Sequence, residues 1–369
     1  MKKILLALIC GSFAWTAIAQ SSFVIEKKLA ATPVKNQEIT GTCWCFSTTS
    51  LVESQCLKSK LGELDLSEWF IVRNIYLEKA KNYILRQGHA QFGEGGLGHD
   101  LIRAINTYGA MPESVYKGLK PTEKVHDHSE LVKSLQHYLD SILKTTPLAD
   151  DWINGYRKIL DDALGTPPAE FDYKGNHYTP KTFATQLMKF NPDDYVLITS
   201  FTHQPYYKPF ILQVPDNFSN AAYYNLPLAD MTKLVETAVN KGYTVSWDAD
   251  VSNNGFNQEK GLALFLNEQA KYSPDAINAD MEEMSWDAAK RQQLYEDLTT
   301  QDDHLMHITG VEKSKGGKTF FIVKNSWGNV GPDKGYINVS EAYFSINTIS
   351  LVVPKAAFSA EQLARLGIR

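Results

Sequence analysis

The chain has 369 residues, a formal net charge of −5 at pH 7, and 43% hydrophobic and 21% charged residues. This composition is that of an ordinary globular protein, and the length allows two subdomains or one large decorated domain. The acidic balance leaves no overall basic surface, so we expect no nucleic acid partner.

The N-terminus has the pattern of a secretory leader. Lys2-Lys3 precede an apolar run that starts at Ile4, and Ala17-Ile18-Ala19 resembles a cleavage site. The run is too short to span a membrane and no second one follows, so we expect a signal peptide over 1–19 and no membrane anchor. The mature domain, 20–369, would then be exported to a bacterial periplasm or secreted.

The stretch Asn36–Ser47 places a thiol at the head of an apolar run. Cys43 follows a Gly-Thr pair and starts a segment that can continue as a buried helix to about Lys60. The first turn of a helix has unpaired N–H groups and the positive end of the helix dipole, so this position favours a reactive thiolate. Gln37 lies six positions earlier, where its amide and the Cys43 N–H could converge as an oxyanion hole. A lone Cys before Trp, however, is more often a buried small side chain.

Two further cysteines, Cys45 and Cys56, share the same expected helix. Neighbours two apart face different ways, and residues eleven apart on a helix lie roughly 16 Å apart. Neither can form a disulfide with Cys43 in that geometry. We expect both to be buried free thiols.

The first half of the chain continues with helices and one glycine-rich loop. A second helix should start after Ser67 as its N-cap and run towards Leu85, and a short one should cover 100–108. Between them, Gly95-Gly96 belong to a loop whose backbone could approach a ligand closely. As a phosphate loop it is poor, because it lacks a preceding apolar strand and a Lys.

Residues from about 118 to 191 have the character of an inserted helical subdomain. Leucines recur at helical spacing, and a further helix is predicted over 150–164. His126 and His128 could be imagined as metal ligands, but no third partner is in view. We expect them on a solvated turn and expect no metal site.

The second half is predicted to be rich in strands. Strands are expected over 195–199, 210–214, 243–247, 304–311, 319–325, 335–339 and 351–353, with a helix over 228–240. Helices first and an antiparallel sheet later indicate an α+β fold with a cleft between the two halves.

Two polar residues in these strands complete a possible catalytic set. Cysteine catalysis needs a base that takes the thiol proton and a third group that orients the base. His304 stands at the entrance of one strand and Asn325 at the end of the next, where it can accept from the imidazole N–H while Trp327 shields the bond. His307 competes for the role of base, but residues three apart on a strand point to opposite faces, so only one can face the cleft.

Two blocks resemble the signatures of the papain-like cysteine peptidases. The blocks consist of Gln37, Gly41, Cys43, Trp44, Phe46 and Ser47, and of Asn325-Ser326-Trp327-Gly328. The resemblance implies a two-lobed fold, with Cys43 as nucleophile, His304 as base, Asn325 orienting the base and Gln37 in the oxyanion hole. It implies peptide substrates that pair with Gly95-Gly96, and no cofactor.

In particular, the chain is similar to the bleomycin hydrolase and aminopeptidase C branch over roughly 34–355. Met306 follows the base as in that branch, although Leu305 replaces a smaller residue, and Val245, Trp247, Asp250 and Val251 match another segment. The branch implies an aminopeptidase that assembles into hexamers. There, the terminal carboxylate of a C-terminal arm recognises the free amino group of the substrate.

The end of the chain departs from this pattern. Only 354–369 follow the last predicted strand, as a short helix over 359–366. If Arg369 does not reach Cys43, an exported endopeptidase with an open cleft becomes the alternative to an aminopeptidase. A peptide-binding relative without catalysis and an enzyme that transfers the acyl group to an amine are further alternatives.

Overall fold

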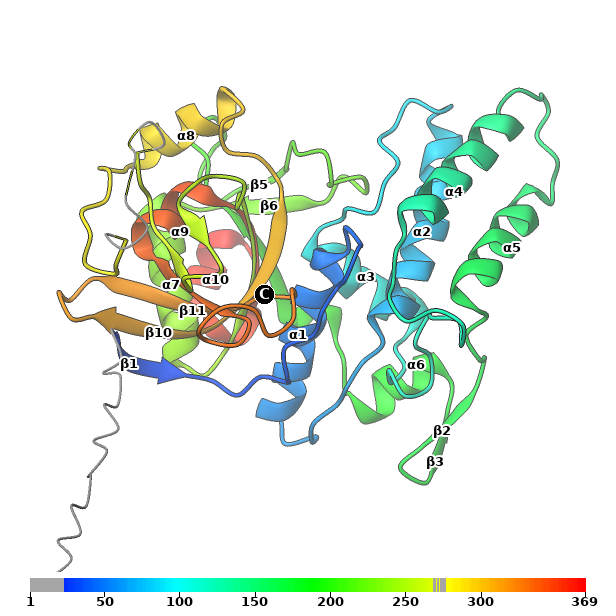
Figure 1. Cartoon of the computed structure of the whole chain (residues 1–369), viewed down its shortest axis with the longest axis horizontal. Helices are drawn as coiled ribbons and strands as arrows, with labels where there is room; N and C mark the ends of the chain where they lie inside the picture. The colour runs from blue at the N-terminus through cyan, green and yellow to red at the C-terminus, as the bar shows by residue number, and fades with distance from the viewer. Residues whose placement is uncertain (1–22, 268–269, 271, 273–276) are drawn as a thin grey trace, which may run out of the picture.

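A computed structural model describes residues 23–267, 270, 272 and 277–369, which form a β-rich lobe and a helical lobe (Figure 1). The predicted mixed α+β architecture is confirmed. The predicted signal peptide, 1–19, lies outside the described residues. In the part of the chain that the structure describes, no helix combines the length and apolar character needed to cross a membrane.

The helical lobe contains the first half of the chain. Its elements are α1 (Cys43–Lys58), α2 (Glu68–Leu85), α3 (Gly98–Tyr108), α4 (Ser129–Ile142), α5 (Trp152–Leu164), β2 (Phe171–Tyr173), β3 (Asn176–Tyr178), α6 (Pro180–Thr182) and a π-helical turn over Phe183–Leu187. The hairpin of β2 and β3 was not predicted. In Figure 1, α4 and α5 lie on the far side of α2 from the β-rich lobe.

Local signals explain where these helices begin and end. Ser67 caps α2 by accepting from the Phe70 N–H at 3.2 Å, as expected. The carboxylate of Asp100 accepts from the Leu97 N–H at 3.0 Å, so α3 begins two residues earlier than predicted. Gly109 ends α3 with a φ of +85°, a conformation that favours glycine.

The prediction of a solvated turn at His126 and His128 is wrong. The two side chains are 8% and 2% exposed. The His126 ring stacks on Trp69 at 3.6 Å between centroids, and His128 Nδ1 lies 2.9 Å from the Tyr76 hydroxyl. Burial lowers the pKa of each imidazole to about 4. Trp69 and Tyr76 come from α2, so the histidines join two segments of the helical lobe.

The β-rich lobe is built on an 11-stranded sheet of order β5-β6-β4-β13-β7-β10-β11-β12-β9-β8, with β1 paired to β10. The strands are β1 (Phe23–Lys28), β4 (Tyr195–Thr199), β5 (Pro209–Ile211), β6 (Ala222–Asn225), β7 (Val245–Ala249), β8 (Phe256–Asn257), β9 (Leu262–Ala263), β10 (His304–Ser314), β11 (Thr319–Lys324), β12 (Tyr336–Ser340) and β13 (Thr348–Pro354). The pairs β4–β6 and β12–β9 are parallel, and the other pairs are antiparallel.

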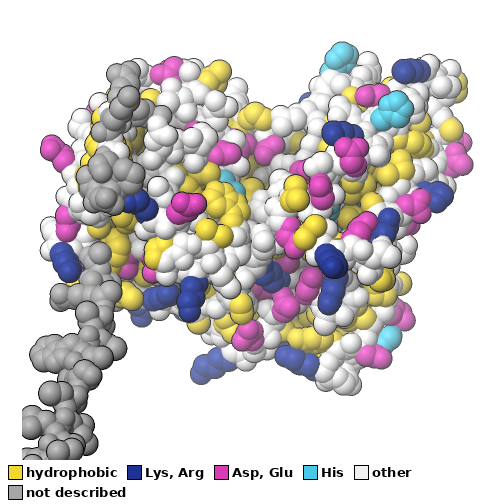
Figure 2. All heavy atoms as spheres, in the orientation of Figure 1, with side chains coloured by type: hydrophobic (Ala, Val, Ile, Leu, Met, Phe, Trp, Pro, Cys, Tyr) yellow, Lys and Arg dark blue, Asp and Glu magenta, His cyan; other side chains and the backbone are white. Residues whose placement is uncertain are grey.

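Helices cover this sheet and link it to the helical lobe. They are α7 (Leu228–Asn240), α8 (Ala288–Glu296), α9 (Glu341–Asn347) and α10 (Ala360–Leu366), with 3₁₀ turns over Pro192–Asp194 and Lys355–Ala357. The bounds of α7 and β4 match the prediction, whereas β1, β6, β8, β9 and α9 were not predicted. On the other side, α1 packs on β10 and β7, where Ser47 Oγ donates to Met306 O at 2.6 Å. The surface is hollowed between the two lobes (Figure 2).

Candidate active site

The predicted nucleophile begins the central helix. Cys43 is the first residue of α1, and its side chain is 7% exposed. The next residue, Trp44, is fully buried and donates from Nε1 to Glu94 O at 3.0 Å. A Cβ on Gly96 would lie 3.1 Å from the Trp44 ring. The loop of Gly95-Gly96 therefore lies against the start of α1, beside the thiol.

The predicted base and its orienting residue are in direct contact. His304 Nε2 lies 2.7 Å from Asn325 Oδ1, and the Trp327 ring lies 4.6 Å from the imidazole. Asn325 Oδ1 also accepts from the Ser326 N–H at 2.7 Å, while its Nδ2 donates to Gln258 Oε1 at 2.9 Å. Because an amide oxygen can only accept, the proton of a neutral His304 resides on Nε2, and Nδ1 is left as the basic nitrogen.

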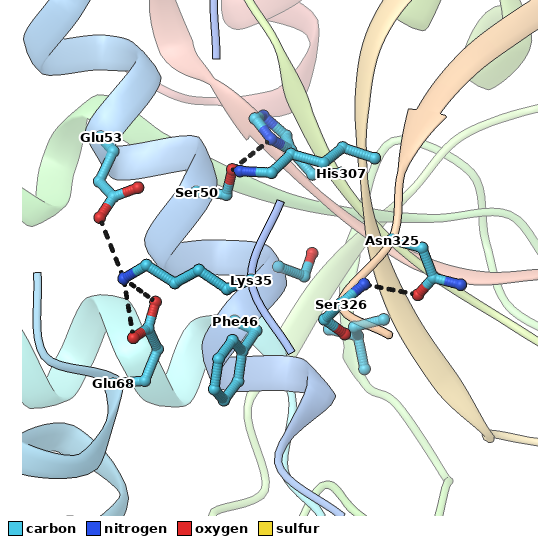
Figure 3. A pocket seen from close by; sticks show the side chains of 11 residues that line it. Lys35, Phe46, Ser50, Glu53, Glu68, His307, Asn325 and Ser326 are labelled. Carbon is cyan, nitrogen blue, oxygen red and sulfur yellow. Dashed lines mark hydrogen bonds and ion pairs between the residues drawn. The ribbon is translucent and has the colours of Figure 1, made fainter. Parts of the chain in front are cut away.

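His307, the competing candidate for the base, points toward Ser50 on α1 and not toward Asn325. His307 Nδ1 lies 2.9 Å from Ser50 Oγ, which also accepts from Lys324 Nζ at 2.8 Å. Figure 3 shows His307 and Ser50 together, apart from Asn325. Burial and the charge of Lys324 hold the pKa of His307 well below its usual value. The strand geometry separates the two histidines in the way that residue spacing predicted.

The Cys43 thiol lies at the start of β10, where His304 is the first residue. The backbone N–H of Leu305 donates to the Cys43 thiol, so the sulfur contacts the residue that follows His304. The antiparallel pairing of β10 with β7 fixes His304 and Leu305 opposite Ala249 and Asp248. Cys43, His304 and Asn325 thus meet where α1 crosses the start of β10.

Burial opposes charge on both reactive groups. Burial, together with Asp216, Asp248 and Asp302, raises the pKa of Cys43 to about 12. Burial lowers the pKa of His304 to about 4, against the effect of Asn325. The helix terminus favours the thiolate, whereas burial and the three nearby carboxyl groups favour the thiol. Where the pair is neutral, the Cys43 proton passes to His304 during attack on a substrate.

Gln37 is held by a residue that sequence reasoning did not single out. Its Oε1 accepts from Ser326 Oγ at 2.6 Å, and its Nε2 donates to Thr40 O at 2.7 Å. An amide nitrogen has two hydrogens, so the second one stays available for an oxyanion. Ser326 was noticed only as part of a motif. Gln258 was missed, because it lies in a polar stretch without a pattern.

Other candidate groups do not join this site. Cys45 and Cys56 are buried and free, as predicted. Within the described ranges, no three His, Cys, Asp or Glu side chains are arranged to hold a metal ion. The backbone oxygen of Arg369 accepts from Lys355 Nζ. The neighbours of Lys355 in sequence, Pro354 and Ala356, line a cavity together with Lys58. Lys58 is the last residue of α1, roughly 22 Å along the helix from Cys43. Arg369 is therefore not placed beside the thiol.

A helix-borne thiol that faces a sheet bearing histidine and asparagine is the arrangement of a papain-like cysteine peptidase. A model of the Peptidase C1-like family matches residues 12–367, and the chain belongs to this family.

Individual relatives are distant but cover most of the chain. Aminopeptidase C from Streptococcus thermophilus is 24% identical over 94% of this chain and 85% of its own length. Bleomycin hydrolase from Homo sapiens is 24% identical over 97% of this chain and 88% of its own. The crystal structure of PepW from Lactobacillus rhamnosis HN001 has a TM-score of 0.74 at 21% identity, over 93% of this chain and 84% of that one. The fold and the relation to the bleomycin hydrolase and aminopeptidase C branch are thus confirmed.

Proposed function

We propose that the protein is an aminopeptidase that hydrolyses peptide bonds with Cys43, His304 and Asn325. The observation that carries this proposal is the 2.7 Å contact between His304 Nε2 and Asn325 Oδ1, next to a residue whose N–H contacts the Cys43 thiol. The aminopeptidases among its relatives favour the same reaction.

In the proposed cycle, Cys43 Sγ bonds to the substrate carbonyl carbon while its proton passes to His304 Nδ1. The negative charge on the oxygen is stabilised by the Cys43 N–H and the second amide hydrogen of Gln37. The C–N bond breaks as His304 returns the proton to the leaving amine, which leaves a thioester. A water molecule then gives a proton to His304 and attacks the thioester, and the thiol regains its proton as the acid leaves.

The roles of the other residues follow from their contacts. Asn325 holds the His304 tautomer with Nδ1 free, and Gln258 fixes the orientation of the Asn325 amide. The backbone of Gly95-Gly96 would pair with an extended substrate beside the thiol, where Asp216 and Trp44 flank the two glycines. We further propose export after cleavage near Gln20 and assembly into a homo-hexamer, which mass spectrometry of the exported protein and light scattering would test.

The test compares one peptide series, with free and with acetylated N-termini, on the parent, Cys43→Ala and a matched control, Cys56→Ala. Cys56 is a buried thiol near the other end of the same helix. We expect Cys43→Ala to lower hydrolysis by at least about 1000-fold and Cys56→Ala to retain it. A thiol-directed epoxide should label Cys43 only.

The products decide between the two peptidase alternatives. Release of residues from free N-termini alone supports the aminopeptidase. Internal cleavage of acetylated peptides supports an endopeptidase, which the distance of Arg369 from Cys43 would permit. If Cys43→Ala and the parent behave alike, the peptidase proposal is wrong.

A further inference from the structure

Three carboxyl groups from distant parts of the chain gather around the thiol. Asp248 belongs to β7, Asp302 lies two residues before β10, and Asp216 lies in the loop between β5 and β6. Each of the three acts electrostatically on Cys43. We call Asp216, Asp248 and Asp302 the acidic pocket.

Strand geometry directs Asp248 at the thiol. Side chains two apart on a strand share a face, so Asp248 lies on the same face of β7 as Ser246. Ser246 Oγ is 2.8 Å from Ser47 Oγ, and Ser47 lies one turn along α1 from Cys43. Asp248 is also the cross-strand partner of Leu305, whose N–H contacts the sulfur.

The other two carboxyl groups extend the pocket to the glycine loop. The Asp216 N–H donates to Asp302 Oδ2 at 3.2 Å, and the carboxyl groups of Asp302 and Asp248 are close enough to share a proton. A Cβ on Gly95 would lie 2.0 Å from Asp216 Oδ2. The acidic pocket therefore fills the space between the nucleophile and the loop proposed to hold substrate.

This pocket has more negative charge than its protein partners neutralise. Among the described residues, none of its carboxyl groups forms an ion pair within 4.0 Å. Asp248 is 1% exposed, and its Oδ2 accepts from Ser350 Oγ at 3.0 Å. In the described chain, a proton shared between the two carboxyl groups is the only donor within reach of Asp248 Oδ1 and Asp302 Oδ1. Lys79 acts on Asp216, but its Nζ donates to Gly93 O at 2.8 Å and to Gly95 O.

A nearby carboxylate shows what a self-sufficient buried group looks like in this protein. Asp100 is fully buried, and its oxygens accept from the Leu97 N–H, Arg103 and Ser219 at 2.8–3.1 Å. Buried carboxylates are costly unless they are paired in this way. Unpaired oxygens beside a nucleophile thus point to a missing cationic partner.

We propose that the acidic pocket binds a cationic group of the peptide substrate, its free α-ammonium, next to the scissile bond. The proposal rests on the proposed function and adds the residues that would select the substrate. An ammonium held by Asp216, Asp248 and Asp302 places the carbonyl of an N-terminal residue near Cys43. These carboxyl groups belong to the body of the two lobes, because Pro354 and Ala356 line a cavity at the far end of α1 and Arg369 O accepts from Lys355. A Lys or Arg side chain of the substrate is the alternative source of the cationic group.

The test measures binding apart from catalysis. The Cys43→Ala protein is titrated calorimetrically with Leu-Leu amide, N-acetyl-Leu-Leu amide and N-acetyl-Lys-Leu amide, alone and with Asp302→Asn or Asp216→Asn. The matched control is Asp193→Asn, an exposed aspartate outside the acidic pocket. We expect acetylation of the Leu peptide, or either pocket substitution, to weaken binding about 10- to 100-fold, the range of charge-assisted hydrogen bonds. Asp193→Asn should leave binding unchanged.

The outcomes separate the two proposals. If N-acetyl-Lys-Leu amide binds as tightly as the free peptide and loses affinity in Asp302→Asn, the pocket binds a side-chain cation and the α-ammonium assignment is overturned. If all three peptides bind equally and the pocket variants change nothing, the pocket is not a cation site. If binding depends on the free amine but the parent hydrolyses no peptide, the proposed function fails while the binding site stands. Thermal unfolding of each variant checks that it is folded.

Discussion

Helix α1 contacts two groups of buried charged side chains that differ in how their charges are partnered. One is the lysine–glutamate cluster of Lys35, Lys324, Glu53 and Glu68 (Figure 3). Lys35 Nζ lies 2.9 Å from Glu68 and 3.7 Å from Glu53, while Lys324 Nζ donates to the hydroxyls of Ser50 and Thr32. The other group is the acidic pocket, in which carboxyl oxygens face one another.

The difference distinguishes a structural group from a binding group. Burial alone would lower the pKa of Lys35, but Glu68, Glu53 and Asp65 together raise it. In the acidic pocket, burial and Asp216 raise the pKa of Asp302 to about 7. The first group contains its own cations, although burial still raises the pKa of Glu68 to about 8. The second group forms no ion pair within 4.0 Å among the described residues, so it needs protons or a ligand. Burial alone thus does not identify a site, whereas several adjacent carboxyl groups without a cation point to one.

The largest expected effect is the loss of a partner from the lysine–glutamate cluster. Glu53 is 1% exposed and accepts from Thr32 Oγ1 at 2.5 Å and from the Leu66 N–H at 2.8 Å. Glu53→Ala should lower the free energy of unfolding by about 3–5 kcal/mol, because two buried donors lose their acceptor and Lys324 loses a nearby counter-charge. Denaturant titration at pH 7 measures this. Glu130→Ala, in an exposed pair with Lys133, is the control and should cost less than about 1 kcal/mol. A loss as small for Glu53→Ala would refute the comparison.

In the acidic pocket, removal of a carboxyl group should raise the free energy of unfolding instead of lowering it. A carboxyl whose folded pKa is raised contributes stability that is present below its unfolded pKa and lost as pH rises through the folded pKa, here from about 4 to about 7. Because an amide does not ionise, the Asp302→Asn variant does not lose this stability as the pH rises. At pH 8 it should raise the free energy of unfolding by about 2–4 kcal/mol relative to the parent, with no gain near pH 4. Denaturant titration at both pH values measures this, with the exposed Asp193→Asn as control. An equal effect of Asp302→Asn at pH 4 and pH 8 would contradict the prediction.

A related effect concerns ligand affinity. Binding an ammonium requires ionised Asp302, whose pKa of about 7 reflects burial, Asp216 and Asp303, with Asp248 and the Asp216 N–H acting in the opposite direction. Lys79 lies close enough to act on the same carboxyl. The affinity of Cys43→Ala protein for Leu-Leu amide should fall by up to about 50-fold from pH 7 to pH 5, because the ionised fraction falls that far. Calorimetry measures it, and a flat profile would count against the site.

The smallest effect tests how the lysine–glutamate cluster is positioned. Ser67 caps α2 immediately before Glu68, and its hydroxyl donates to Tyr116 O at 2.6 Å. Ser67→Ala should lower the free energy of unfolding by about 1 kcal/mol. Ser67→Thr should retain most of it. Equal stability of Ser67→Ala and the parent would mean that the cap does not help to hold Glu68.

Much of the fold was predictable because its signals are local. Apolar periodicity and turn residues gave α7 and β4 with their observed bounds, and Ser67 marked the start of α2. The short strands β8 and β9, of two residues each, carry too little pattern to predict. They form because β12 offers β9 an edge to pair with, and β9 in turn pairs with β8.

The sequence by itself determined the catalytic candidates. Cys43, His304 and Asn325 were recognised from residue types, spacing and motif, and the chemistry of the thiol and imidazole requires those types. The family comparisons support the same branch.

Only the tertiary structure decided the environment of these groups. His126 and His128 looked solvated because nothing near them in sequence covers them, and Trp69 and Tyr76 reach them from another helix. The acidic pocket joins positions 32 to 86 residues apart, and it acts on Cys43 in the opposite direction to the helix terminus that the sequence does reveal. Burial and electrostatics depend on distances across the fold, which neither local periodicity nor residue spacing specifies.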